Sequence, residues 1–357
     1  MGKFVIDEDV RGTIGDVSAF SVPGLDNMKR AARGENPPPP IHHLTGIKPT
    51  DAGIGTAAYS MPVTKWLEDS LGVIHGGVYA FLADAALASA LLTGMPPGRG
   101  VNTSQLFLSY VRPSTRRTGN LVARARSVYV GREVGISETT IEDNEGRLMA
   151  YGSTRCVFPD IPVEPGMDLM PRPEPVTDPP DPYLREVPDS AYADLAEYDT
   201  GVPVEMMQRT IRGEQPTSPS VTLGGFEYLS VEPGRNTMRM RKSPWFSAGG
   251  PAMYGGMIAW GCDEVLGGAV YSTLSPGEVY ASLDMEVRFL RPVFLDEERL
   301  MFTGEVEHSG RRIRVAKVDV TDEKGKRVAM AVGSAMIVPG GVRELMRGRL
   351  ADEIYRG

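Results

Sequence analysis

Two stretches of this chain are almost wholly apolar over the length of a long helix. Residues 75–92 are rich in Leu, Ala and Phe, which favour helix, and Gly94 with the prolines after it ends the stretch. Residues 257–274 form a second stretch of the same kind. A helix that is apolar on every side has to be buried, so each stretch predicts a central helix enclosed by other elements.

Segments that alternate between apolar and polar residues follow each predicted helix. A period of two is typical of strands with one buried face, and turn residues such as those at 143–146 separate the segments. The predicted strands cover residues 101–113, 120–130, 133–143 and 147–158, and then 278–292, 298–309, 312–323 and 327–338. A curved antiparallel sheet wrapped around one long helix buries both elements, which predicts an α+β fold.

The two halves of the chain repeat one pattern. Matched positions lie 179 residues apart, and 181 apart near the end, where the second copy has two more residues. The matches are Arg33-Gly34-Glu35 with Arg212-Gly213-Glu214, His75-Gly76-Gly77 with Tyr254-Gly255-Gly256, Asp84 with Asp263, Arg112-Pro113 with Arg291-Pro292, Gly131-Arg132 with Gly310-Arg311, and Tyr151-Gly152-Ser153 with Val332-Gly333-Ser334. Such an ordered series indicates a duplication.

The duplication predicts two tandem domains packed as an internal pseudo-dimer. We assign residues 1–160 to the first domain and residues 201–340 to the second. Residues 161–200 are rich in proline and acids, a composition that favours extended chain and predicts a linker. Residues 341–357 have helical spacing and predict a C-terminal helical tail.

Charge and cysteine content narrow the class of protein. A net charge of -8 and a pI of about 5.3 argue against a nucleic-acid partner, whose phosphates require a basic face. The N-terminus has no apolar signal segment and no long apolar run occurs, so we expect a cytoplasmic protein without a membrane partner. Two cysteines and four histidines without zinc-binding spacing lead us to expect no metal.

One acid interrupts the first apolar helix. Asp84 is the only charged residue within residues 76–98. Burial of an unpaired carboxylate is costly and calls for a raised pKa or a dedicated partner, so Asp84 is a candidate base or nucleophile. Alternatively it faces a water-filled crevice or pairs with Arg124 or Arg126. Asp263 stands at the same place in the second helix, which favours a shared role.

Paired glycines open each predicted helix, as Gly76-Gly77 and Gly255-Gly256. Amide groups at a helix N-terminus carry partial positive charge and can polarise a carbonyl, and glycine lets a ligand approach the backbone. Alternatively, the glycines only admit the turn into the helix or a close strand crossing.

One helix cannot bring its own glycines and its own acid to one carbonyl. The eight residues from Gly76 to Asp84 correspond to a rise of about 12 Å along the axis. Two helices that lie side by side and antiparallel would place Gly76 near Asp263 and Gly255 near Asp84. The duplication therefore predicts composite sites, to which both copies contribute.

These residues resemble a known family. LGVIHGGVYAFLADAA followed by VNTSQLFLSYVRP is similar to hotdog-fold thioesterases of the phenylacetic-acid-degradation (PaaI-like) and 4-hydroxybenzoyl-CoA thioesterase type. Their signature is a His-Gly-Gly that opens a central helix, with an Asp or Glu nine residues after the His. Asp84 follows His75 by nine residues and Asp263 follows Tyr254 by nine. The second copy matches more weakly, so the whole chain resembles a double-hotdog protein.

The resemblance implies hydrolysis of an acyl-CoA thioester, with coenzyme A as part of the substrate and no cofactor. The acid would act as general base toward water or as a nucleophile that forms an anhydride. Relatives of this kind often assemble further, which allows a homodimer of such chains. The implied catalytic residues are Asp263, Asp84, Gly76, Gly77, Gly255, Gly256, Thr103 and Ser282.

Further residues are expected to contact the substrate. Arginines near the ends of the strands would face the phosphates of coenzyme A, or alternatively form a solvated, salt-bridged surface. The expected substrate-binding residues are His75, Asp69, Tyr254, Arg112, Arg116, Arg117, Arg311 and Arg312.

The second copy departs from the family pattern. Tyr254 replaces the histidine, SAGGPAM replaces DSLGVI ahead of the helix, and Ala248 stands where the first copy has Asp69. These changes lie at the Gly255 and Asp84 site, whereas the Gly76 and Asp263 site keeps the family pattern. They also motivate a second hypothesis, a protein of the same fold that binds an acyl ligand without hydrolysing it. A hotdog hydratase ranks last, because its Asp and His pattern ahead of the helix is not found.

Overall fold

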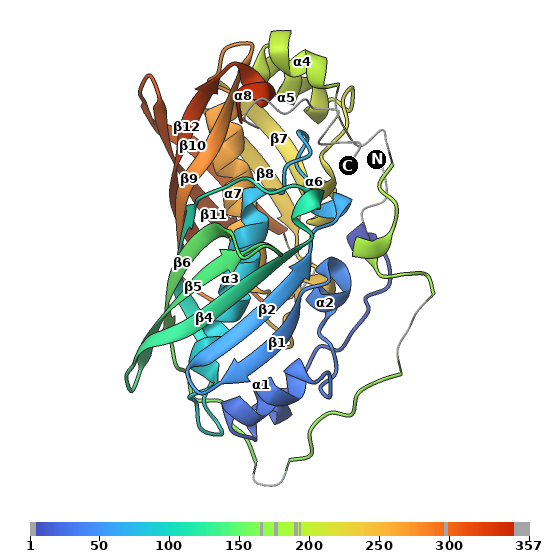
Figure 1. The fold of residues 1–357 in the computed structure, drawn as a ribbon, viewed down its shortest axis with the longest axis vertical. Coiled ribbons are helices and arrows are strands. Elements are labelled where there is room, and N and C mark those ends of the chain that lie inside the picture. Colours follow the sequence, from blue (N-terminus) through green and yellow to red (C-terminus); the bar gives the residue numbers. More distant parts are fainter. Residues whose placement is uncertain are drawn as a thin grey trace.

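The computed structural model describes residues 5–164, 167–174, 178–188, 192, 194–295 and 299–345. Within these residues, twelve strands form one continuous antiparallel sheet in the order β1-β2-β4-β5-β6-β3-β9-β12-β11-β10-β8-β7. The first copy, blue to green in Figure 1, and the second copy, yellow to red, follow one another along the long axis of the molecule.

Each half of the sheet comes from one copy. The strands of the first copy are β1 (Lys48–Gly53), β2 (Thr56–Pro62), β3 (Asn102–Tyr110), β4 (Asn120–Val130), β5 (Val134–Glu142) and β6 (Leu148–Val157). Those of the second are β7 (Phe226–Glu232), β8 (Arg235–Arg241), β9 (Glu278–Phe289), β10 (Arg299–Ser309), β11 (Ile313–Asp322) and β12 (Arg327–Pro339). The predicted strands are all present.

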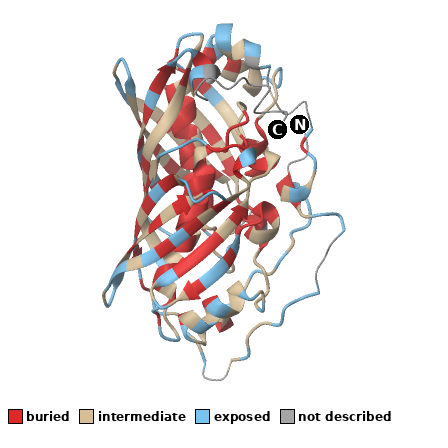
Figure 2. Ribbon diagram, viewed as in Figure 1, coloured by how far each residue is buried: buried red, intermediate tan, exposed pale blue. Residues whose placement is uncertain are grey.

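The helices repeat at the offset found in the sequence. Helix α1 (Gly24–Ala32) corresponds to α5 (Pro203–Ile211), and α2 (Pro40–Thr45) to α6 (Pro219–Leu223). The central helices are α3 (Gly76–Leu92) and α7 (Gly255–Tyr271), whose residues are nearly all buried, as Figure 2 shows in red. The fold is therefore a double hotdog, with one enclosed helix in each curved half-sheet.

The structure adds two strands ahead of each central helix that the sequence pattern does not predict. Strand β1 contains Pro49 and an irregular register after it, and three consecutive residues of β2 are buried, so neither strand alternates cleanly. Strands β7 and β8 are their counterparts in the second copy. These pairs extend the sheet around the outer side of each helix.

The two halves meet where β3 pairs with β9. Phe107 lies opposite Glu286, and these residues are related by the offset of the repeat, so the pseudo-twofold axis passes between them. Strand β3 pairs with β6 on its other side, which places it in the interior of the sheet. The pseudo-dimer is thus held together by backbone hydrogen bonds as well as by helix packing.

The segments outside the two copies contain short helices. Helix α4 (Leu195–Thr200) lies inside the segment predicted as a linker, and α8 (Gly341–Leu345) begins the predicted C-terminal tail. The remainder of that tail, residues 346–357, lies outside the described residues. In the part of the chain that the structure describes, none of the helices combines the length and apolar character needed to cross a membrane.

Candidate active site

The two central helices run side by side in opposite directions, so the N-terminus of each meets the acid of the other. A β-carbon placed on Gly76 would stand 2.6 Å from Asp263 Oδ2, and one placed on Gly255 would stand 3.1 Å from Asp84 Oδ2. The first glycine of each pair therefore allows a carboxylate from the other copy to lie directly over the helix end.

The second glycine of each pair has a packing role. A β-carbon on Gly77 would stand 2.6 Å from the Cα of Trp260, and one on Gly256 would stand 2.9 Å from the Cα of Phe81. Non-bonded carbon atoms do not approach one another this closely, so only glycine at these positions lets the two helix backbones come so near. The second glycine of each pair thus permits a close approach, but to the other central helix and not to a crossing strand.

Asp263 is held in a buried, polar environment. The Tyr110 hydroxyl donates a hydrogen bond of 2.9 Å to Oδ1, and the carboxylate is only 7% exposed. Burial raises the pKa of Asp263 above its usual value, although His75 and the hydrogen bond from Tyr110 oppose this rise. A carboxylate of this kind is a stronger base than one in water.

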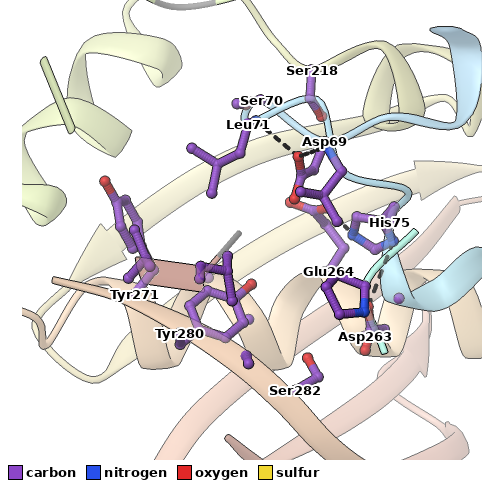
Figure 3. A pocket seen from close by; sticks show the side chains of 18 of the residues that line it. Asp69, Ser70, Leu71, His75, Ser218, Asp263, Glu264, Tyr271, Tyr280 and Ser282 are labelled. Carbon is purple, nitrogen blue, oxygen red and sulfur yellow. Dashed lines mark hydrogen bonds and ion pairs between the residues drawn. The ribbon is translucent and has the colours of Figure 1, made fainter. Parts of the chain in front are cut away.

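A second acid, Glu264, lies beside Asp263 and contacts the residue that caps α3. His75 precedes the helix, and its Nε2 lies 2.6 Å from Glu264 Oε2. On the other side of the imidazole, Nδ1 accepts the Gly77 amide at 3.0 Å. The Tyr228 hydroxyl also donates to Glu264. Figure 3 shows His75, Glu264 and Asp263 grouped together.

A cavity of about 530 Å³ opens from this group of residues. Gly76, Asp263 and Glu264 border it, and Tyr280 and Ser282 reach it from β9. Its remaining walls include residues of the loop before α3, of the segment after β3, of α5, of the second half of α7, and of β9 and β12, with Tyr198, Met206, Met207, Tyr271, Val279 and Val338 among the lining residues. The cavity is large enough for a small-molecule ligand, and Gly76, Asp263 and Glu264 stand together in its wall.

Asp69 also borders the cavity, but its carboxylate is already engaged. Oδ1 accepts the backbone amides of Leu71 at 2.8 Å and Val73 at 3.1 Å, which fixes the loop that leads into α3. Burial raises the pKa of Asp69 to about 6. The residue predicted to bind substrate thus shapes the loop beside the site.

The other junction, at Gly255 and Asp84, lacks most of these groups. Thr103 donates to Asp84 Oδ1 at 2.7 Å, but Phe289 occupies the position that corresponds to Tyr110. Tyr254 makes no capping bond and instead donates its hydroxyl to the Phe81 carbonyl at 2.6 Å. Neither Arg124 nor Arg126 pairs with Asp84, since they contact Glu142 and Glu138.

A cavity of about 450 Å³ occupies the corresponding place in the first copy, but it is chemically different. It is lined by residues of α1, α2, β1 and the N-terminal segment, and by Ala248 in place of Asp69. Asp84 is absent from its lining among the described residues. The second junction therefore has an acid and glycines, but this cavity does not reach the acid.

We expect replacement of Asp84 by asparagine to stabilise the protein at neutral pH. Burial raises the pKa of Asp84 to about 6, so the ionised form is penalised in the folded state above that pH. Asparagine can still accept the Thr103 hydroxyl, and the free energy of unfolding at pH 7.5 should rise by about 1 to 3 kcal/mol. The gain should shrink as the pH falls toward 4, where the carboxyl is neutral. Denaturant unfolding at both pH values tests this, and a gain that is absent or independent of pH contradicts it.

The arginines proposed for phosphate binding are not brought together. Arg112 borders the main cavity, whereas Arg116 forms a 2.7 Å ion pair with the buried Glu68. Arg117 is exposed, and so are Arg311 and Arg312, which lie between β10 and β11. None of these last three is among the described residues that line the cavity. Of the five, only Arg112 is positioned beside the cavity and free of a carboxylate partner among the described residues.

Three residues of the site were not predicted. Glu264 interrupts the second apolar helix just as Asp84 interrupts the first, so the same search applied to that helix would have found it. Tyr110 and Tyr228 come from strands, where an aromatic residue at a half-buried position is ordinary and gives no signal.

Comparison with known proteins agrees with this architecture. Residues 71–150 and residues 250–329 each match the model of the thioesterase superfamily. Among solved structures, the tesB protein of Mycobacterium avium subspecies paratuberculosis superposes with a TM-score of 0.52 at 13% identity, covering 88% of this chain and all of its own. The acyl-CoA thioesterase II TesB2 of Mycobacterium marinum gives 0.51 at 12% identity, covering 84% of this chain and 98% of its own. At these identities the likeness concerns the fold.

Sequence relatives match one copy at a time. A protein of Halobacterium salinarum that carries the name of an esterase is 33% identical over 101 residues, which are 27% of this chain and 65% of that protein. The 1,4-dihydroxy-2-naphthoyl-CoA hydrolase of Listeria monocytogenes is 22% identical over 118 residues, 33% of this chain and 93% of that protein. The fold and the composite junction define a double-hotdog protein. Each copy of the repeat therefore carries a segment similar to the thioesterase superfamily, at residues 71–150 and 250–329.

Proposed function

We propose that this protein hydrolyses an acyl-CoA thioester at the junction of Gly76 and Asp263. The observation that carries this proposal is the position of a buried carboxylate over a helix N-terminus at the end of a cavity. An electrophile and a base are thereby held within reach of one carbonyl group, and the acyl group has space beyond them.

The amide of Gly76 is the proposed electrophile. Gly76 borders the cavity, and within the described residues no acceptor is bonded to its N–H. The Gly77 amide is instead directed to His75 Nδ1. A thioester oxygen bound at Gly76 would meet the positive end of α3, which stabilises the negative charge that develops as the carbonyl is attacked.

Asp263 is the proposed base or nucleophile. As a base, it removes a proton from water while the water oxygen bonds to the carbonyl carbon; the C–S bond then breaks and the proton passes to the departing sulfur. As a nucleophile, an Oδ atom forms a mixed anhydride and releases the thiolate, and water then hydrolyses the anhydride. Both routes yield the free acid and coenzyme A, and in both the Tyr110 hydroxyl orients the carboxylate.

The same chemistry is not proposed at Asp84. The acid there is enclosed, Phe289 offers no hydroxyl, and the neighbouring cavity does not reach it. Ser282, at the equivalent of Thr103, borders the main cavity and is available to a water molecule or to the substrate. At the rim of that cavity, Arg112 is the proposed contact for the phosphates of coenzyme A.

A panel of acyl-CoA thioesters tests this function. We expect purified protein to release free thiol from at least one member of a set with short, medium and aromatic acyl groups, far above the uncatalysed rate. Thiol release can be followed by a colorimetric reagent. Absence of release from every member, combined with measurable binding of the same thioesters, would instead support a protein that holds an acyl ligand without hydrolysing it.

A further inference from the structure

Glu264 has no part in the reaction as proposed, although it is nearly as enclosed as Asp263. Its side chain is 11% exposed, and Ala85 stands at the corresponding place in the first copy. Two adjacent buried carboxylates repel one another, so the second one needs compensating contacts. It has two of them, the His75 imidazole and the Tyr228 hydroxyl.

The contacts of His75 define where its proton lies. The Gly77 N–H points at Nδ1 from 3.0 Å, which requires that this nitrogen carry no proton. The proton of the neutral ring is then on Nε2, directed to Glu264 at 2.6 Å. Tyr228, Glu264, His75 and the Gly77 amide thus form one chain of hydrogen bonds that ends in the first turn of α3.

We propose that Glu264 is a positioning residue that acts through His75. By accepting the Nε2 proton, it keeps Nδ1 available to the Gly77 amide and so holds the first turn of α3, with the Gly76 amide, in place against Asp263. This inference rests on the proposed hydrolysis at the Gly76 and Asp263 junction. It assigns to Glu264 a role that its equivalent, Ala85, cannot have.

Protonation of His75 opposes this arrangement. Burial lowers the pKa of His75, but Glu264 and Asp263 on α7 and Asp69 on the loop before α3 raise it, to about 9. The Tyr110 hydroxyl from β3 and the Tyr228 hydroxyl from β7 face the two acids of α7.

A second proton on the His75 ring can only be placed on Nδ1, where it would oppose the Gly77 N–H. That proton would break the bond to Gly77 and direct Nδ1 to Asp263 Oδ2, 3.5 Å away.

The hydrogen-bond geometry therefore corresponds to the neutral imidazole, and the charged imidazole is a second, inactive arrangement. The negative charge of Glu264 favours the charged imidazole of His75, whereas its oxygen atoms accept the Nε2 proton of the neutral imidazole. The charge and the hydrogen-bond acceptor can be separated by substitution. Glutamine keeps an acceptor for Nε2 and loses the charge, whereas leucine removes both.

Four variants test the proposal by steady-state kinetics over a range of pH. We expect E264Q to keep kcat within about threefold at alkaline pH and to move the acid limb of the pH profile downward, because His75 is then harder to protonate. We expect E264L to lower kcat by about 30-fold or more with KM changed by less than about threefold. The single variants H75N and E264L and the double variant that combines them form a double-mutant cycle. If Glu264 acts through His75, kcat of the double variant should equal kcat of H75N within about twofold.

Nitrogen-15 NMR of the four histidines gives a readout that does not depend on activity. At about pH 10.5, above the pKa of His75, the wild-type protein should show His75 as a neutral ring with its proton on Nε2, and E264L should lose this single tautomer. A doubly protonated His75 at this pH, additive losses in the cycle, or an unshifted acid limb in E264Q would each overturn the proposal. Absence of thioester hydrolysis in the wild type would overturn the proposed function instead, and the NMR result would still decide the hydrogen-bond chain.

Discussion

Replacement of Asp263 by asparagine should lower kcat for thioester hydrolysis by about a thousandfold, the usual scale for loss of a general base or nucleophile. Asparagine keeps the shape of the side chain and an acceptor for the Tyr110 hydroxyl, so the fold and the cavity should persist. KM should change little, because the acyl group is held mainly by the walls of the cavity. Thiol release under saturating substrate measures the effect.

Asp84→Asn is the matched comparison, since it removes the equivalent carboxylate from the other junction. There the acid is enclosed and borders neither of the two cavities described, so kcat should stay within about threefold of the wild type. Equal losses in both variants would indicate that both junctions hydrolyse substrate. Full activity in Asp263→Asn would remove the proposed mechanism altogether.

Replacement of Gly77 by alanine should destabilise the protein through the packing of the central helices. The added methyl group would stand 2.6 Å from the Cα of Trp260, a backbone atom that cannot rotate away. The helices must separate, and the free energy of unfolding should fall by about 1 to 3 kcal/mol, even though alanine favours helix. Urea denaturation followed by tryptophan fluorescence measures the change.

Gly250→Ala is a suitable control for this effect. Gly250 precedes α7 in the equivalent lead-in loop, and an added β-carbon there meets nothing within 4 Å. Its stability should match that of the wild type. If Gly77→Ala proved as stable as this control, the close approach of α3 and α7 at Gly77 would not be a determinant of stability.

The arrangement of the two central helices followed from the sequence by simple reasoning. The repeat indicated two equal units, and the distance from Gly76 to Asp84 along one helix required that each acid serve the other unit. Both pairs meet in the structure as this argument requires. The reasoning worked because helix geometry is fixed by the backbone and does not depend on which side chains surround it.

Features that depend on side-chain contacts between residues far apart in the chain could not be predicted from the sequence. Nothing in the pattern around Tyr110 shows that its hydroxyl reaches an acid 153 residues away. Strands β1 and β2 were not predicted, because their burial does not alternate. The phosphate role of Arg116 was inferred from charge alone, and the structure instead pairs it with Glu68, a buried acid that needs a partner.

The pairing of β3 with β9 affects how this protein can evolve and how it behaves on dilution. Two identical subunits joined in this way would separate at low concentration, and any substitution would appear on both sides of the axis at once. Within a single polypeptide, β3 pairs with β9 at every protein concentration, and each copy can mutate independently. One junction thus has Tyr110 and Glu264, whereas the other has Phe289 and Ala85 at the corresponding places, a difference that two identical subunits could not carry.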